Sequence, residues 1–321
     1  MKKKKKRSTT PWLIAAFLIG LFMLLYPGLA DYYNSFMLSG VIVHYAEIVA
    51  TMDEDQYNAI WESALAYNER LEAEPLEWTL TPEQAEAYDA ELNINDTGNM
   101  GYIDIPKINV SLPIYHGTEE QVLQTSIGHI ESTSLPVGSR HSGEDFGQAD
   151  FGSHCVLSGH RGLPSTKLFS ELDQLVEGDV FILTVLDQTL TYEVDQIRIV
   201  EPYDLSELKI EPGRDLCTLV TCTPYGVNTH RMLVRGHRIE NEKKTDIRII
   251  ADGIRIQPMF VAPFIAIPVL VLLIIWMLIV TSAWRRRKVR RKRSELRREI
   301  RESFHEELRT GRGDLGDHAE E

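Results

Sequence analysis

The chain has 321 residues, of which 43% are hydrophobic and 25% charged, so it can fold around a sizeable core. Its net charge is −13, and residues 31–255 carry fifteen basic against thirty-eight acidic residues, which excludes nucleic acid as a partner. Three cysteines without paired spacing such as C-x-x-C exclude a disulfide-stapled scaffold and predict neither a metal site nor a cofactor.

The first thirty residues hold a basic segment followed by an apolar one. Residues 1–10 read MKKKKKRSTT, and residues 11–30 contain no charged side chain. An uncharged stretch of this length can cross a bilayer, although Gly28-Leu29-Ala30 also resembles a signal-peptide cleavage site. The sequence therefore predicts either a retained transmembrane anchor or a removed signal.

Residues 31–94 are predicted to be helical, because apolar side chains recur every three or four positions. The recurring residues are Ile42, Ala46, Val49, Met52, Ile60, Ala64, Tyr67 and Leu71. Pro75 and Pro82 interrupt the pattern, and Thr81 is placed to cap a short acidic helix that opens with Pro82.

Residues 95–240 change to a pattern of short strands that begins near Gly101. Apolar and polar residues alternate in GYIDIPKINVSLPIYHGT, and later apolar runs end at turn signals such as Asp187-Gln188. Seven or eight such strands, with a helix near Ser165–Leu175, predict a mainly β domain that is either a barrel or a sandwich.

Cys222 ends an apolar, β-branched run in the stretch TLVTCTPYG. If residues 216–223 form a strand, Cys222 and Val220 share one face and Cys217 lies on the other. A cysteine at a strand end can be both rigidly held and exposed, as a nucleophile requires, whereas a buried cysteine acts as a small apolar residue. Burial suits Cys155 and Cys217 better, and a disulfide between those two is an alternative.

A nucleophilic thiol needs a neighbour that accepts its proton. His160 in LSGHRG ends another predicted strand, and its flanking glycines leave room for a substrate. Glycines also suit a plain turn, so His154 and His237 remain competing candidates from spacing alone.

Arg231 follows Cys222 by nine residues and opens the next predicted strand. An antiparallel pairing would bring its guanidinium beside the sulfur, where forked donors suit a developing oxyanion. Arg235 shares the face of Arg231 and is the rival, and a surface ion pair with one of the many acids is the alternative for either arginine.

The chain after the strands repeats the pattern of its beginning. Residues 241–259 form a predicted linker, residues 260–284 are uncharged and long enough to span a bilayer, and residues 285–321 form a tail that opens with RRRKVRRKR. The positive-inside rule puts both basic ends in the cytoplasm and the acidic region outside the cell. We therefore expect a protein of the cell membrane with an extracellular domain.

These motifs resemble the sortases, the membrane-anchored transpeptidases of Gram-positive bacteria. The strings TLVTC and SGHRG, and an arginine soon after the cysteine, are typical of that family. The longer strings MGYIDIPKINVSLPIYHGT, SLPVG, LSGHRGLPSTKLF and TLVTCTPYGVNTHRMLVRGHR, with the second apolar segment, resemble the pilin-polymerising class C. The resemblance is dense over residues 95–240 and looser over the apolar segments.

The resemblance implies an eight-stranded β-barrel with Cys222 as nucleophile, His160 as proton donor and acceptor, and Arg231 as stabiliser of the oxyanion. Its substrates would be pilin or surface-protein precursors with an LPXTG-like sorting signal, cleaved between threonine and glycine. A lysine amine of the next pilin subunit would then resolve the acyl-enzyme. Transfer to peptidoglycan, hydrolysis by a cysteine peptidase and a non-catalytic membrane scaffold are the alternatives.

Class C members often carry a lid before the barrel, an Asp-Pro-aromatic motif that covers the active site. The corresponding stretch here is EAEPLEWTL, in which Glu74 replaces the aspartate, Pro75 is kept, and Leu76 stands in the aromatic position with Trp78 two residues on. The resemblance therefore implies a lid with altered anchoring, and a proline break between two acidic helices is the alternative.

Overall fold

The computed structural model describes residues 10–74, 77–142, 148–164, 166–241, 274–276, 287–303 and 305–306. The chain divides into two units, Met1–Gly253 and Ile254–Glu321. In the second unit the described residues are helical. The predicted linker at 241–259 and membrane segment at 260–284 lie almost entirely outside the described residues.

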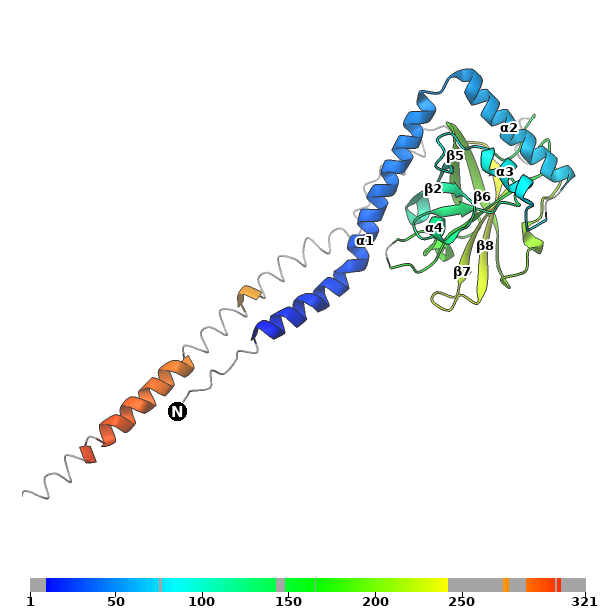
Figure 1. The fold of residues 1–321 in the computed structure, drawn as a ribbon. Helices are drawn as coiled ribbons and strands as arrows, with labels where there is room; N and C mark the ends of the chain where they lie inside the picture. Colours follow the sequence, from blue (N-terminus) through cyan, green and yellow to red (C-terminus); the bar gives the residue numbers. More distant parts are fainter. Residues whose placement is uncertain are drawn as a thin grey trace, which may run out of the picture. The chain divides into compact units, whose positions relative to one another are not determined.

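Three helices precede the strands (Figure 1): α1 (Thr10–Ala50), α2 (Glu54–Ala73) and α3 (Pro82–Ala90). The apolar segment 11–30 does not form an element of its own, because α1 continues through Pro27 for another twenty-three residues. Within the described residues, no single helix qualifies as a membrane span by length and apolar character. The segments Phe17–Ala50 and Glu54–Ala73, bent by 115° at their junction, qualify when taken together.

The predicted start of α3 is confirmed. The Thr81 hydroxyl accepts the backbone N–H of Gln84, while the Thr81 N–H donates to Gln84 Oε1 at 2.9 Å. Pro82 occupies the first helical turn, where its missing N–H costs nothing. This reciprocal cap sets the point at which the chain leaves the loop after α2.

Eight strands close into a barrel in the order β1-β2-β3-β4-β7-β8-β6-β5. Their bounds are β1 (Asn99–Ile105), β2 (Val110–His116), β3 (Ile127–His129), β4 (Ser153–Ser158), β5 (Val180–Val185), β6 (Gln188–Val200), β7 (Asp215–Thr223) and β8 (His230–Ile239). Strand β4 runs parallel to β7, and β2 parallel to β3, while the other neighbouring pairs are antiparallel. The predicted eight-stranded, mainly β barrel is confirmed, and the sandwich alternative is wrong.

Short helical turns join some of the strands. They are η1 (Pro106–Ile108), α4 (Glu120–Leu123), η2 (Leu172–Gln174) and η3 (Ser206–Leu208). The helix expected near Ser165–Leu175 is reduced to η2, because Leu168 has a φ of +37°, which a right-handed helix does not accommodate.

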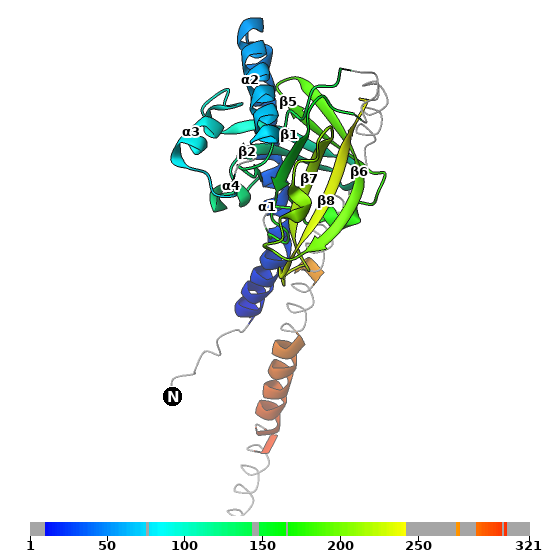
Figure 2. The ribbon, with the colours of Figure 1, turned by 90° about the vertical axis from the view of Figure 1, so that its right-hand side faces the viewer.

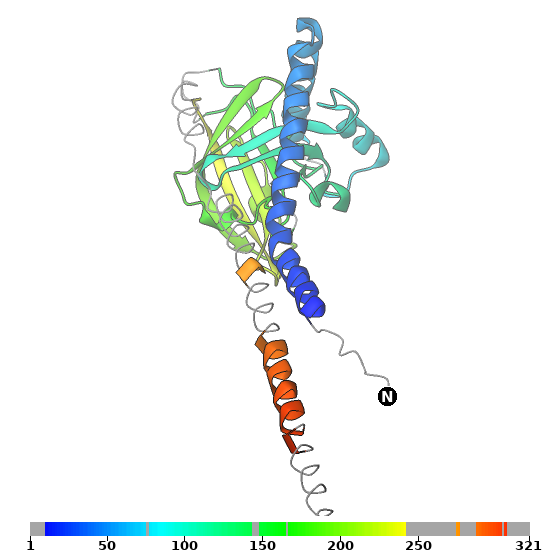
Figure 3. The same cartoon turned by 90° about the vertical axis from the view of Figure 1, so that its left-hand side faces the viewer.

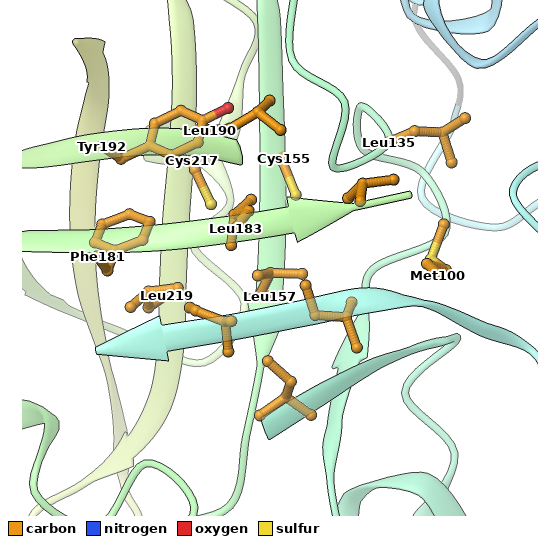
Figure 4. Close-up of a cluster of buried hydrophobic side chains, with 14 of the residues drawn as sticks. Met100, Leu135, Cys155, Leu157, Phe181, Leu183, Leu190, Tyr192, Cys217 and Leu219 are labelled. Atoms are coloured by element: carbon orange, nitrogen blue, oxygen red, sulfur yellow. The ribbon is translucent and has the colours of Figure 1, made fainter. Parts of the chain in front are cut away.

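Apolar side chains from alternate strand positions fill the barrel (Figure 4). Cys155 on β4 and Cys217 on β7 are register partners and point into this core, where both are fully buried free thiols. The alternative of a disulfide between them is therefore wrong. Beside them the rings of Phe181 and Tyr192 stack with centroids 5.5 Å apart.

The second half of α1 packs against strands β1 and β2 of the barrel (Figures 2 and 3). Tyr45 is the centre of this contact and is 1% exposed. Its hydroxyl donates to the carbonyl of Met100 at 2.9 Å and accepts the N–H of Leu186 at 2.8 Å. Two buried backbone groups at the barrel edge thus depend on a helix residue, which ties α1 to the domain.

Candidate active site

Strands β7 and β8 set Cys222 directly opposite Arg231 near the turn of their hairpin. Side chains that face each other across an antiparallel pair project from the same side of the sheet. Cys222 is half-buried, unlike the two core cysteines. The antiparallel pairing expected from the sequence is therefore observed, and it brings a thiol and a guanidinium together.

The loop after β4 brings His160 to the same place. Gly159 N–H donates to the carbonyl of Val220 at 3.0 Å, and the Thr221 hydroxyl donates to the carbonyl of Gly159 at 2.8 Å. These bonds prolong the parallel register of β4 and β7 past the end of β4. If this register continues for two more residues, His160 lies beside Cys222 on the neighbouring segment.

Gly159 is required for this approach. A Cβ atom at position 159 would lie 2.7 Å from the ring of Phe169 and 3.0 Å from a methyl group of Ile127. Both neighbours are fully buried. The glycine before His160, read from the sequence as room for a substrate, instead lets the loop pack tightly onto the barrel.

His160 has one acidic neighbour that the sequence-based reasoning missed. Its Nε2 lies 3.7 Å from Glu120 Oε2, and the side chain of His160 is 29% exposed. Glu120 belongs to α4, forty residues before the histidine, and no local motif marks it. Its exposed carboxylate can attract positive charge that develops on the imidazole.

The competing histidines lie elsewhere. His154 and His237 are both register partners of Leu216, six residues along β7 from Cys222, or about 20 Å at the rise of a strand. His154 is 1% exposed and hydrogen-bonded by both ring nitrogens, to Lys209 O at 2.8 Å and to the Thr218 hydroxyl at 2.7 Å. Burial lowers the pKa of His154 to about 4. His154 thus has a structural environment, distant from Cys222.

The two candidate arginines also separate. Arg235 donates from Nε to Asp195 Oδ1 at 2.9 Å and from a second nitrogen to Asp195 Oδ2 at 3.1 Å, and it contacts Glu211 at 3.1 Å. Arg231 instead donates to the carbonyls of Asn228 and His230. In the part of the chain that the structure describes, Arg231 forms no ion pair, so its charge is available to a substrate.

An apolar cluster supports this face of the barrel from outside. Its buried members are Val156 of β4, Val220 of β7, Leu233 of β8 and Leu208 of η3. They alternate with the core residues of the same strands, as predicted for Val220 against Cys217. Leu205 and Leu208 therefore pack on the same face of the sheet as Val220 and Cys222.

The lid segment is described only in part. Glu74 is the exposed residue that follows α2, Trp78 is 45% exposed, and Pro75 and Leu76 lie outside the described residues. The carbonyl of Glu77 accepts a hydrogen bond from Ser132 at 3.0 Å. Among the described residues, no hydrogen bond or ion pair joins Glu74 or Trp78 to the thiol, imidazole or guanidinium, and the lid stays a prediction.

Two hollows on the first unit do not belong to this site. One of about 580 Å³ lies where α1 and α2 meet the β5–β6 turn, and one of about 690 Å³ lies between α1 and residues such as Asn99 and Tyr115.

Within the described ranges, no group of three or more histidine, cysteine and acidic side chains could hold a metal ion.

Comparison with known proteins decides the family. A model of the sortase domain matches residues 103–239. The crystal structure of sortase C1 from Streptococcus agalactiae is 51% identical, with a TM-score of 0.59, over 63% of this chain and 99% of that one. The chain belongs to the sortase family, class C. Sortases are cysteine transpeptidases, so the predicted enzyme class is confirmed.

Two further relatives extend the comparison. Sortase C of Streptococcus pneumoniae, described for its catalysis and pilin substrate specificity, is 42% identical with a TM-score of 0.54 over 63% of this chain and 97% of that one. Sortase D of Bacillus subtilis is 30% identical over 43% of this chain, and the match spans 63% of the relative's length. The region of this sortase that matches the family model, residues 103–239, contains Cys222, His160 and Arg231, whose catalytic roles stay predictions.

Proposed function

We propose that this sortase cleaves an LPXTG-like sorting signal between threonine and glycine and joins the acyl group to a lysine amine of a pilin subunit. The observation that carries the proposal is the pairing of Cys222 with Arg231, with the loop of His160 alongside. Support for a pilin substrate comes from the similarity to the Streptococcus pneumoniae enzyme.

In the first half-reaction, His160 takes the proton of the Cys222 thiol as Sγ attacks the threonine carbonyl carbon. Arg231 donates hydrogen bonds to the oxyanion that forms, and its charge is permanent. The Thr–Gly bond then breaks, and His160 returns the proton to the glycine nitrogen that leaves. The product is a thioester between Cys222 and the substrate.

In the second half-reaction, a lysine amine attacks the thioester carbonyl and gives a proton to His160. Sγ departs as the new amide bond forms, and the proton returns to the thiol. Arg231 stabilises the second oxyanion at the same position. Water could replace the amine, and the product then identifies a peptidase rather than a transpeptidase.

We also propose that residues 11–30 and 260–284 anchor the enzyme in the cell membrane, with both termini cytoplasmic and the barrel extracellular. The basic ends and the acidic middle region support this orientation. So do the large apolar side chains that α1 exposes, for example Met23 at 70% and Leu24 at 76%. Anchoring would bring the enzyme close to membrane-held precursors.

The proposal predicts that Cys222→Ala abolishes high-molecular-weight pilin ladders in cells that express the enzyme and its pilin. Incubation of the wild type with an LPXTG-like peptide, with and without an added amine, should give a thioester and then an amide by mass spectrometry. Cys217→Ala, in the core of the same strand, is the control and should retain both products.

The acceptor found in the product separates the alternatives. A pilin lysine supports pilus assembly, a peptidoglycan stem peptide identifies a wall-anchoring sortase, and free acid in the presence of amine identifies a peptidase. Ladders that persist in Cys222→Ala would remove the nucleophile assignment. A wild type that forms no thioester with this peptide would contradict the proposed LPXTG-like substrate.

A further inference from the structure

We propose that Arg161 is a positioning residue, which fastens the loop of His160 to the strand end that carries Cys222. The inference rests on the proposed function, because it concerns how the proposed proton acceptor is aligned with the proposed nucleophile. Arg161 directly follows His160, and the sequence motif alone gives it no role.

The side chain of Arg161 is unusually enclosed for a loop arginine, with 9% of its surface exposed. Its guanidinium forms an ion pair with Asp173 of η2 and donates to the Thr223 hydroxyl at 3.4 Å. It also lies over the ring of Tyr225, 5.9 Å from the centroid. One planar group thus bridges three segments: the His160 loop, η2, and the chain that follows Cys222.

The His160 loop depends on such contacts, because β4 ends at Ser158 and the ladder ends soon after. The carbonyl of His160 accepts the N–H of Phe169, and the N–H of Gly162 donates to the Ser170 hydroxyl. Both bonds hold the loop to segment 169–170 alone. Beyond the two bonds of Gly159 to β7, the Arg161 contacts with Thr223 and Tyr225 join this loop to the nucleophile side.

The imidazole itself has little direct support. Among the described residues, the one charged or hydrogen-bonding group near its ring is the exposed carboxylate of Glu120, 3.7 Å from Nε2. Since no other hydrogen bond or ion pair of the described residues holds the ring, its position depends on the backbone that carries it and on packing. Since a displacement of about 1 Å can lower a rate roughly 100-fold, the fastening at position 161 should affect the chemical step.

The shape of the guanidinium matters as well as its charge. One edge of the planar fork pairs with a carboxylate, another donates to a hydroxyl, and the flat face stacks on an aromatic ring. Lysine supplies one point charge and cannot make all three contacts. Asp173→Asn removes the charge of one partner and leaves Arg161 in place, so it weakens the same fastening from the other side.

The test measures kcat and KM of the full-length enzyme on a quenched LPXTG-like peptide, alongside thermal unfolding. Arg161→Met should lower kcat about 100-fold with KM unchanged, because binding is retained and alignment lost. Arg161→Lys and Asp173→Asn should give intermediate kcat values. Arg140→Met is the matched control, since Arg140 forms ion pairs with Glu62 and Glu69 of α2, and in the described part of the chain no hydrogen bond or ion pair joins its side chain to the site.

A kcat of Arg161→Met equal to that of the wild type would overturn the inference. So would a loss of kcat that matches the loss of folded protein, or that Arg140→Met reproduces. If Arg161→Met does not fold, Arg161→Lys and Asp173→Asn decide by the same criterion. An inactive wild type would instead contradict the proposed function, so the two failures are distinguishable.

Discussion

The side chains of Arg231 and Arg235 project from the same face of β8, yet they have different binding partners. Arg235 is held on two sides by Asp195 and Glu211, which neutralise it. Arg231 is held by two backbone carbonyls, which orient the guanidinium but leave its charge uncompensated. A residue that must stabilise a transient anion benefits from the second arrangement.

Arg231→Met is therefore expected to lower kcat by about 100-fold or more, the usual cost of removing an oxyanion donor. Arg235→Met should keep kcat and lower the melting temperature by roughly 5 °C, because it leaves Asp195 and Glu211 with fewer partners. Steady-state kinetics and thermal unfolding of both variants check this. If Arg235→Met loses turnover while Arg231→Met keeps it, the assignment is reversed.

At the scale of elements, His154 of β4 is hydrogen-bonded both to β7 and to the loop between η3 and β7. The carbonyl of Lys209 can only accept, so Nδ1 of His154 carries the proton and Nε2 accepts from the Thr218 hydroxyl. Burial lowers the pKa of His154 to about 4, from the ordinary 6.5. A neutral imidazole is therefore part of the packing between two parallel strands.

This burial predicts a pH-dependent stability. Below pH 6.5 the unfolded chain binds a proton at position 154 that the folded chain excludes down to about pH 4, so stability falls as pH falls. The loss approaches about 3 kcal/mol at pH 4. His154→Gln can donate to Lys209 and accept from Thr218 without titrating, and its unfolding free energy should vary less between pH 7 and pH 4.5. If the unfolding free energies of the wild type and of His154→Gln change equally between pH 7 and pH 4.5, the prediction is contradicted.

Local signals explain which elements could be predicted. The cap at Thr81 and the alternation of Cys222 with Cys217 follow from short-range rules and are both observed. The pairing of β4 with β7 joins residues about sixty positions apart, and nothing in the local pattern specifies it. Spacing alone therefore favours His160 without excluding His154 and His237, and the family resemblance selects His160.

The two residues that sequence reasoning does not find, Glu120 and Arg161, both act through contacts between distant segments. Glu120 reaches His160 from α4, and Arg161 reaches Thr223 and Asp173 through side-chain contacts. Such contacts arise only when separate segments pack, so neither periodicity nor motif spacing indicates them. The helix expected near Ser165–Leu175 is interrupted at Leu168, a buried residue with a φ of +37°, which no periodicity in the sequence indicates.

At the scale of the whole molecule, charge and exposed apolar surface are segregated along the chain. The basic ends, the acidic middle and the exposed apolar side chains of α1 are all consistent with the proposed membrane orientation. A soluble domain rarely exposes so many large apolar residues on one helix. The proposed anchor explains that surface.

The orientation predicts that a protease added to intact protoplasts digests the barrel and spares epitope tags at both termini. Tags at residue 1 and residue 321, followed by immunoblotting, provide the measurement, and permeabilised protoplasts should lose both. Disappearance of the N-terminal tag during normal growth would show that residues 11–30 are a removed signal. Protection of the barrel would contradict the extracellular location.

The burial of Cys155 and Cys217 has a practical consequence for work with the enzyme. Because the two core sulfurs are sealed inside the closed sheet, a maleimide dye should attach once per native molecule and three times in denaturant. The stoichiometry of labelling therefore reports opening of the barrel. Position 222 can also carry a fluorophore without any substitution elsewhere in the chain.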